Sequence, residues 1–252
     1  MKSMICGINP VREALKAAGE NRAEIDCICV SFRRKDSLIS GIVGEARRMG
    51  IAVRECAPEE LYSITGGAPH QGVIAYLRGG YRYIDLDDLL GVWKGSGERA
   101  FFLLLDSIQD PQNMGSLLRA AHTAGTHGVV VPKDRSCPVT AAVIKASAGA
   151  AMHTPVAMVT NLRDAIKRLK DEGVWVVGVE AGSEKSIYRA DLEGDIAIVV
   201  GSEGKGLRRL VKEECDFCVH IPMRGVVNSL SSAQAGVVAL FEARRQRDRA
   251  GK

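Results

Sequence analysis

Glycines and small polar residues gather in two short stretches whose types and spacing could bind a ligand. Residues 201–207 read GSEGKGL and residues 221–232 read IPMRGVVNSLSS, each after an apolar run. Glycine lets the backbone approach a ligand closely and adopts positive φ angles. A third candidate loop, residues 106–113, follows another apolar run. These loops predict a binding site built largely from backbone.

The two common phosphate-binding motifs do not fit these loops. The stretch GVEAGSEKS at 178–186 has Ser183 where a P-loop needs lysine directly after its second glycine. The pair Gly204 and Gly206 is followed by Leu207 and two arginines, so the third glycine of the dinucleotide fingerprint is missing. The sequence therefore argues against a P-loop and against a classical Rossmann cofactor site.

The cysteines do not predict a metal site. Seven cysteines, an odd number without an export signal, favour reduced thiols. The only zinc-like spacing is Cys215 and Cys218 with His220 nearby, and the nearest other pair, Cys27 and Cys29, is a C-x-C in another domain. We therefore expect no metal.

Apolar runs in the second part of the chain predict a parallel sheet. Strand-like runs at 101–105, 128–132, 174–179 and 196–200 alternate with helical patterns at 113–124, 138–149, 161–171 and 229–246. Continuous apolar strands separated by helices are typical of an α/β sheet covered on both faces. Ligands bind such sheets at the carboxyl ends of the strands, where the three candidate loops begin.

The rest of the chain predicts a separate small domain. Residues 1–77 alternate short helical and strand-like runs, which indicates a small α/β domain. Residues 78–98 are rich in glycine, tyrosine and charge and predict a linker with its break near 95–97. Residues 99–252 then form the second domain.

Composition limits the class of protein. The chain has 252 residues, of which 46% are hydrophobic and 25% charged, as in soluble globular proteins. Its apolar runs are strand-length and its N-terminus lacks the core of a signal peptide, so we expect a cytoplasmic protein without membrane spans. A net charge of +4, with basic clusters such as residues 33–35, 208–209 and 244–245, is compatible with nucleic acid.

Three motifs occur in order in the second domain. They are N-x-G-x-x-x-R-x-A from Asn113 to Ala121, G-x-E-x-x-G-L from Gly201 to Leu207, and I-P-M-x-G-x-x-x-S-L from Ile221 to Leu230. Together they resemble the SpoU (TrmH) family of RNA ribose 2′-O-methyltransferases. GINPVREAL at 7–15 and HQGVIAYL at 70–77 resemble the L30e-like substrate-binding domain of its large-subunit rRNA guanosine branch.

The resemblance implies a fold and a cofactor. The fold is a SPOUT-type parallel α/β sheet whose C-terminal segment forms a trefoil knot, an exception to general topology rules. The cofactor is S-adenosylmethionine, held in the knot's loops. The residues implied to bind it are Gly201, Gly204, Ile221, Met223 and Leu230.

The resemblance also implies catalytic residues. Arg119 stands where the family places its catalytic arginine, which is proposed to help activate the 2′-hydroxyl. Because a guanidinium is a poor base, we favour the hypothesis that Arg119 holds the target phosphate and stabilises the developing alkoxide. Asn113 caps the helix that carries Arg119 and has a site role. Glu203 organises the active site, and Ser229 is the motif serine, at the N-terminus of the last helix.

The third motif departs from the family pattern. The family has S-L-N-x-S, whereas here Ser231 replaces the asparagine and Ala233 the second serine. Serine has one short hydroxyl where asparagine has a carbonyl and an amide. Substrate positioning is the function that this change would affect, with Asn228 as a candidate to compensate.

The resemblance further implies the partners. The family works as homodimers in which the arginine of one subunit reaches the site of the other. The substrate is rRNA, not DNA, because the 2′-hydroxyl is the target, and Arg33, Arg34 and Lys35 are candidates to contact it. Two alternatives remain: a tRNA 2′-O-methyltransferase, and a non-catalytic RNA-binding protein of ribosome assembly.

Overall fold

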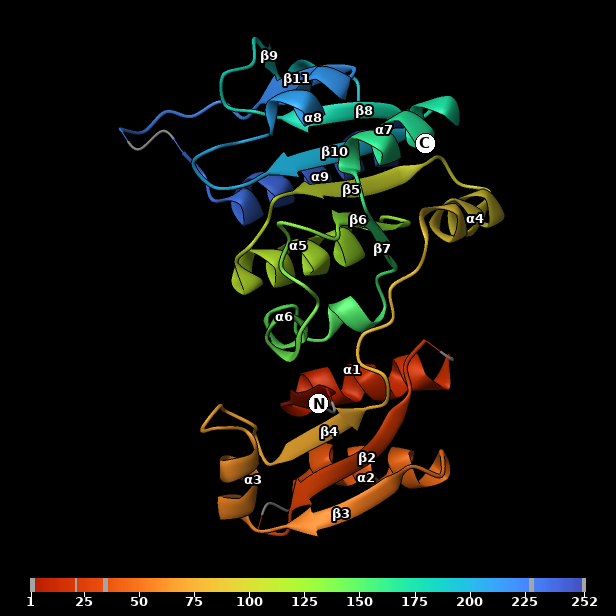
Figure 1. Cartoon of the computed structure of the whole chain (residues 1–252), viewed down its shortest axis with the longest axis vertical. Coiled ribbons are helices and arrows are strands. Elements are labelled where there is room, and N and C mark those ends of the chain that lie inside the picture. Colours follow the sequence, from red (N-terminus) through yellow and green to blue (C-terminus); the bar gives the residue numbers. More distant parts are fainter. Residues whose placement is uncertain (1–2, 21, 34–35, 227–228, 251–252) are drawn as a thin grey trace. The chain divides into compact units, whose positions relative to one another are not determined.

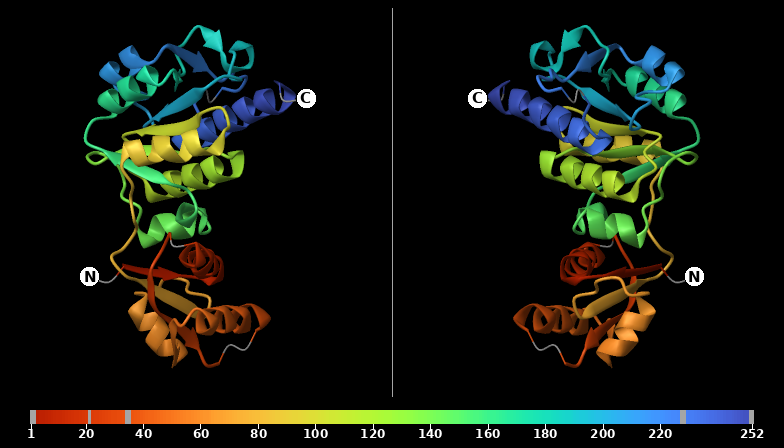
Figure 2. Two further views of the ribbon diagram at one scale, coloured as in Figure 1. Left: turned by 90° about the vertical axis from the view of Figure 1, so that its right-hand side faces the viewer. Right: turned by 90° about the vertical axis from the view of Figure 1, so that its left-hand side faces the viewer.

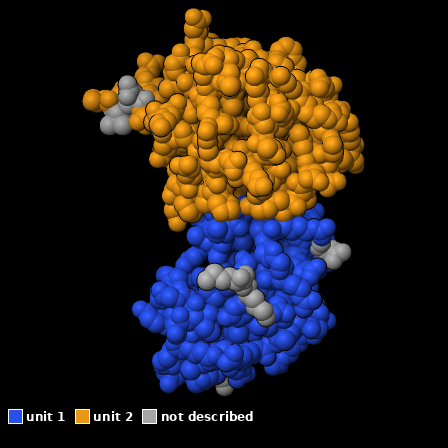
Figure 3. All heavy atoms as spheres, viewed as in Figure 1, with its two compact units in different colours: residues 1–82, 139–153 blue, residues 83–138, 154–252 orange. Residues whose placement is uncertain are grey.

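The structure, a computed structural model, describes residues 3–20, 22–33, 36–226 and 229–250. By its contacts the chain divides into two compact units, coloured separately in Figure 3. Unit 1 contains residues 1–82 and 139–153, and unit 2 contains residues 83–138 and 154–252. The domain boundaries inferred from the sequence remain a prediction. Helix α4 (Leu86–Ser96) lies within the stretch predicted as a linker.

Unit 1 is built on a four-stranded sheet with the order β1-β4-β2-β3 (Figure 1). Its strands are β1 (Ser3–Cys6), β2 (Ile25–Ser31), β3 (Ala52–Cys56) and β4 (Val73–Leu77), and its helices include α1 (Ile8–Gly19), α2 (Ser37–Arg48) and α3 (Pro58–Ile64). β2 and β3 are parallel, whereas β4 is antiparallel to β1 and β2. The sequence did not predict β1 or α3, because four and seven residues are too few to show a clear period.

A segment from the second half of the sequence belongs to unit 1. It carries the helix α6 (Ala141–Ala146) and the 3-10 turn η1 (Ala150–Met152). Lys145 Nζ donates to the carbonyl of Pro69 at 2.9 Å, which ties the segment to the turn before β4. The helix predicted over 138–149 is too long, because Ala148 and Gly149 have φ angles of +54° and +92°.

Unit 2 contains a seven-stranded sheet in which every neighbouring pair is parallel. The strands, in the order β7-β6-β5-β10-β8-β11-β9, are β5 (Phe101–Asp106), β6 (Gly128–Pro132), β7 (Val156–Val159), β8 (Trp175–Val179), β9 (Lys185–Ser186), β10 (Ile196–Gly201) and β11 (Phe217–His220). Besides α4, the helices are α5 (Pro111–Ala124), α7 (Leu162–Asp171), α8 (Arg209–Glu214), α9 (Ser232–Ala250) and the 3-10 turn η2 (Ile187–Arg189). The predicted α/β class is confirmed, and the three strands that the sequence missed have only two to four residues.

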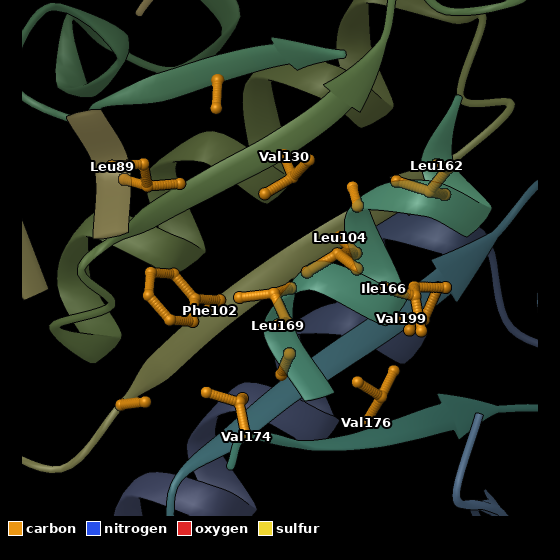
Figure 4. Packing of buried hydrophobic residues seen from close by; sticks show 14 of the residues in the cluster. Leu89, Phe102, Leu104, Val130, Leu162, Ile166, Leu169, Val174, Val176 and Val199 are labelled. Carbon is orange, nitrogen blue, oxygen red and sulfur yellow. The ribbon is translucent and has the colours of Figure 1, made fainter. Parts of the chain in front are cut away.

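One face of this sheet packs against α4 and α7. Phe102 and Leu104 of β5 point to this face, where they are fully buried beside Ile166 and Leu169 of α7 (Figure 4). Leu89 of α4 completes the cluster. Each fully buried side chain of this size contributes roughly 1.5–3 kcal/mol, so the apolar strands are held firmly behind the loops at their ends.

The other face is covered by α5 and α9, which lie side by side (Figure 2). At the C-terminal end of α9, the guanidinium of Arg247 donates to the carbonyls of Arg99 (2.6 Å), Ala100 (3.1 Å) and Gly194 (2.6 Å). At its N-terminal end, Ser232 Oγ donates to the carbonyl of Gly201 at 2.8 Å. The chain after β11 therefore returns to the end of β10. Among the described residues, no helix combines the length and apolar character needed to cross a membrane.

His127 makes unit 2 sensitive to pH. Its Nδ1 accepts a hydrogen bond from the N–H of Phe101 at 3.1 Å, so this nitrogen must be unprotonated, and burial lowers the pKa of the ring. The unfolded ring binds a proton near pH 6.5 and the folded ring only at lower pH. We therefore expect the free energy of unfolding to decrease as the pH is lowered below about 6.5.

Urea titrations near pH 7.5 and near pH 5.5 measure this loss of stability. His127→Gln removes the titrating group and should lose less stability over the same interval. Equal losses in the two proteins would show that His127 contributes nothing to the pH dependence.

Candidate active site

A cavity of about 250 Å³ opens at the carboxyl ends of β8 and β10. The loop after β10 forms one wall, and the chain between β11 and α9 forms another. The five residues predicted to bind a cofactor, Gly201, Gly204, Ile221, Met223 and Leu230, all line it, together with Glu203 and Ser229. Two of the three candidate loops thus meet in one cavity.

The loop 201–207 is closed on itself by its backbone. Ser202 and Gly206 exchange two hydrogen bonds of 3.0 and 3.1 Å. A Cβ at Gly201 would collide with the backbone of Gly206, and Gly204 and Gly206 have φ angles of +74° and +62°. Other residues at these positions would displace the loop, so packing and backbone conformation explain the glycines.

A buried ion pair fixes the far end of this loop. Asp106, the last residue of β5, is fully buried, and its carboxylate accepts hydrogen bonds from the N–H of Arg208 at 2.8 Å and from its Nε at 2.5 Å. The strand register places Asp106 beside Gly201. Neither Asp106 nor Arg208 was predicted to be a site residue, although residue 106 begins the third candidate loop and residue 208 belongs to a basic cluster.

Glu180 is a third residue at this site that was not predicted from the sequence. It follows β8, and its Oε2 accepts a hydrogen bond from the N–H of Leu207 at 3.2 Å. Lys212 Nζ lies 3.5 Å from its other oxygen. Because Glu180 also lines the cavity, it adds a second carboxylate to that of Glu203.

A second cavity, of about 190 Å³, shares Ser202, Glu203 and Ser232 with the first. Asn113 Nδ2 donates to Glu203 Oε1 here at 3.1 Å, so two predicted catalytic residues meet. The prediction that Asn113 caps its helix is wrong. Asp110 is the N-cap and accepts a hydrogen bond from the N–H of Asn113 at 2.8 Å, which leaves the Asn113 side chain for Glu203.

Arg119 lines neither cavity. Its side chain is exposed on α5, and no carboxylate pairs with it in the part of the chain that the structure describes. Six residues after Asn113 correspond to about 240° around a helix, so the two side chains leave α5 in different directions. Within one chain, the structure brings Asn113 and Glu203 together and leaves Arg119 apart from them.

The N-terminus of α9 corrects a further prediction. The helix begins at Ser232, so Ser229 does not stand at its N-terminus. Ser231 is the cap: its Oγ accepts from the N–H of Gln234 at 3.2 Å, and Gln234 Oε1 accepts from the N–H of Ser231 at 2.9 Å. This reciprocal pair is a capping box. Ser231, the residue that departs from the family motif, therefore caps the last helix, α9. Asn228, the candidate to compensate, lies outside the described residues.

We expect Ser231→Ala to lower the free energy of unfolding by about 1 kcal/mol, because it removes this cap. Ser231→Asn restores the family residue and should change stability by only a few tenths of a kcal/mol, since asparagine caps about as well as serine. Urea denaturation compares the three proteins. Equal stability of the alanine variant and the parent would contradict the capping role.

The remaining predicted features lie elsewhere. Arg33 pairs with Glu59 at 2.9 Å on the surface of unit 1, and Arg34 and Lys35 lie outside the described residues. All seven cysteines are free thiols. Over the described ranges, no group of three or more His, Cys, Asp or Glu residues is arranged to hold a metal ion.

A parallel sheet with a glycine-built cavity at the carboxyl ends of its strands, lined by residues of two of the three motifs, is the architecture expected of the class of α/β methyltransferase that the motifs predict. Residues 100–241 match the SpoU rRNA Methylase family, and residues 4–80 match a domain described as RNA 2′-O ribose methyltransferase substrate binding. The chain therefore belongs to the SpoU rRNA methylase family.

Individual relatives agree with this assignment. The chain is 42% identical over 244 residues to the 23S rRNA (guanosine-2′-O-)-methyltransferase RlmB of Xylella fastidiosa, covering 96% of each protein. It is 37% identical over 249 residues to RlmB of Escherichia coli, covering 98% of this chain and 100% of the relative. The crystal structure of the SpoU methyltransferase AviRb from Streptomyces viridochromogenes in complex with AdoMet shares the fold, with a TM-score of 0.80, 23% identity and coverage of 98% and 90%.

Proposed function

We propose that this protein transfers the methyl group of S-adenosylmethionine to the ribose 2′-hydroxyl of a guanosine in 23S rRNA. The observation that carries this proposal is the single cavity into which the sheet brings all five predicted cofactor residues. The names of the relatives support the substrate. A cytoplasmic location is part of the same proposal, and the free thiols are consistent with it.

The residues of the cavity fit the cofactor. Ile221 and Leu230 offer apolar contacts for the adenine, and the closed glycine loop offers backbone groups without side chains in the way. Glu180 adds a negative charge, which favours a positively charged sulfonium. When bound, S-adenosylmethionine supplies an electrophilic methyl group.

The chain's own residues then have distinct roles. Asn113 and Glu203, joined by their hydrogen bond, fix the position of α5 relative to the cofactor loop (residues 201–207). Arg119 holds the phosphate next to the target ribose and stabilises the oxygen as its proton leaves. In-line methyl transfer demands close alignment of three atoms, so positioning supplies a large share of the rate.

The exposed position of Arg119 supports a shared active site. Because this side chain lines neither cavity of its own chain, we assign it to the site of a second subunit. In a symmetric dimer that packs through α5 and α9, one two-fold interface would bring the Arg119 of each subunit to the active site of the other. Neither cavity would be complete without the second copy.

The test is methyl transfer from labelled S-adenosylmethionine to undermodified 23S rRNA, with tRNA in parallel. We expect 2′-O-methylation of a guanosine in the rRNA, located by nuclease mapping. Transfer to tRNA alone would overturn the substrate and favour the tRNA enzyme. Salt-dependent RNA binding without transfer to either RNA would favour the non-catalytic RNA-binding protein.

A further inference from the structure

Two thiols lie together in unit 2 and take no part in the proposed methyl transfer. Cys215 follows α8, and Cys218 lies in β11. Both sulfurs stand over Gly178 of β8, because a Cβ built on that glycine would lie 2.8 Å from the sulfur of Cys218 and 3.2 Å from that of Cys215. Only glycine at position 178 leaves room for both.

The two thiols are in different electrostatic settings. The interaction between the two neighbouring thiols lowers the pKa of Cys218 and raises that of Cys215, whose Sγ donates to the carbonyl of Val211 at 3.3 Å. The positive charge of Lys212 also lowers the pKa of Cys218, and it outweighs the opposing carboxylate of Glu180. Asp216 raises the pKa of Cys215. Cys218 is therefore the better nucleophile of the two, and Cys215 is the neighbouring thiol that can react with it in a second step.

Unit 1 contains a thiol pair that lacks these features. Cys29 and Cys56 also lie together in one buried cluster, but each is only 2% exposed. Burial raises the pKa of Cys29 to about 12 and also raises that of Cys56. Cys215 and Cys218 are less deeply buried than this pair and pack at the edge of the core of unit 2. The chain thus carries an inert pair that serves as an internal control.

We propose that Cys215 and Cys218 form a redox-active dithiol that closes reversibly to a disulfide beside the proposed cofactor cavity. The oxidant is a small-molecule disulfide such as glutathione disulfide. The Cys218 thiolate attacks one of its sulfurs, the disulfide bond breaks, and one glutathione leaves as a thiolate. Cys215 then loses its proton and attacks the Cys218 sulfur, which forms the protein disulfide and releases the second glutathione. Two protein thiols are oxidised and one glutathione disulfide is reduced to two thiols.

The sequence offers a direct readout of the disulfide. Trypsin cuts after Lys212 and Arg224, so one peptide carries both cysteines. In the full-length protein equilibrated with glutathione disulfide, we expect this peptide to lose the mass of two hydrogen atoms and to regain it with dithiothreitol. With Cys215→Ser, Cys218 should instead keep a bound glutathione. A peptide that stays reduced in fully oxidising buffer would overturn the proposal.

Alkylation rates test the assignment of the nucleophile. At about pH 7, iodoacetamide should modify Cys218 at least about tenfold faster than Cys29 or Cys56 in the same sample. Lys212→Met should slow the alkylation of Cys218. Lys167→Met, which removes an exposed lysine of α7, should leave that rate unchanged. Equal rates at Cys218 and Cys29 in the parent protein would refute the proposed reactivity without any variant.

Discussion

Arg119→Ala should lower the rate of methyl transfer by about 10²–10³-fold, because it removes a charged donor from the developing alkoxide. Affinity for S-adenosylhomocysteine should not change, since Arg119 lines neither cavity. Arg119→Lys keeps the charge but loses the planar fork that binds a phosphate bidentately, so we expect an intermediate rate. Single-turnover kinetics and calorimetric cofactor binding measure the two quantities separately. Full turnover with unchanged RNA affinity in the lysine variant would exclude this role.

Mixed dimers decide which subunit uses the arginine. Gly201→Ala should displace the cofactor loop, because its Cβ would collide with the backbone of Gly206, and so prevent cofactor binding while leaving Arg119 intact. If Arg119 acts across the interface, mixing this variant with Arg119→Ala restores one complete site in each heterodimer. Random exchange of equal amounts should then give about a quarter of the parent activity. No recovery after subunit exchange, verified by mass spectrometry, would place the arginine in its own subunit's site.

Asp106→Ala should lower the free energy of unfolding by about 3 kcal/mol, because it leaves the N–H and part of the guanidinium of Arg208 without partners. The Asp106 side chain is fully buried, whereas that of Arg208 is 37% exposed. Water can therefore replace part of the hydrogen bonding that the arginine loses, but not all of it. Asp106→Asn keeps the volume but turns a donor toward Arg208, and a similar loss is expected. Both variants should also weaken binding of S-adenosylhomocysteine, since Arg208 ends the cofactor loop.

An exposed ion pair nearby provides the control. Arg209 and Glu213 pair on α8 with side chains 76% and 51% exposed. Arg209→Ala should therefore cost less than about 1 kcal/mol and leave cofactor affinity unchanged. Urea denaturation and calorimetry apply to all variants. If the alanine variants at positions 106 and 209 were equally stable, the buried pair would not be what fixes the loop.

The sequence predicted the parts of the fold that depend on local pattern. The runs at 101–105 and 196–200 gave the central strands, because a strand buried on both faces is continuously apolar. The same reasoning placed the candidate loops at the carboxyl ends of these strands. The short strands β7, β9 and β11 were not predicted, because two to four residues are too few to show a hydrophobic pattern.

Helix ends were predicted less well for a related reason. Asn113 and Ser229 are residue types that cap helices, but so are Asp110 and Ser231, which actually do so. Residue type alone cannot choose among neighbouring candidates. The choice depends on where each helix docks: Asn113 turns to Glu203, ninety positions away in sequence.

By itself, the sequence determined the α/β class, the family motifs and the loops that build the cavity, because apolar period and glycine spacing are local properties of the chain. Tertiary structure alone decided that Asp106 holds Arg208, that Glu180 faces the cavity and that Arg119 turns away from it. Each of these features depends on residues that are far apart in sequence. Only the folded path of the chain decides whether such residues lie together or apart.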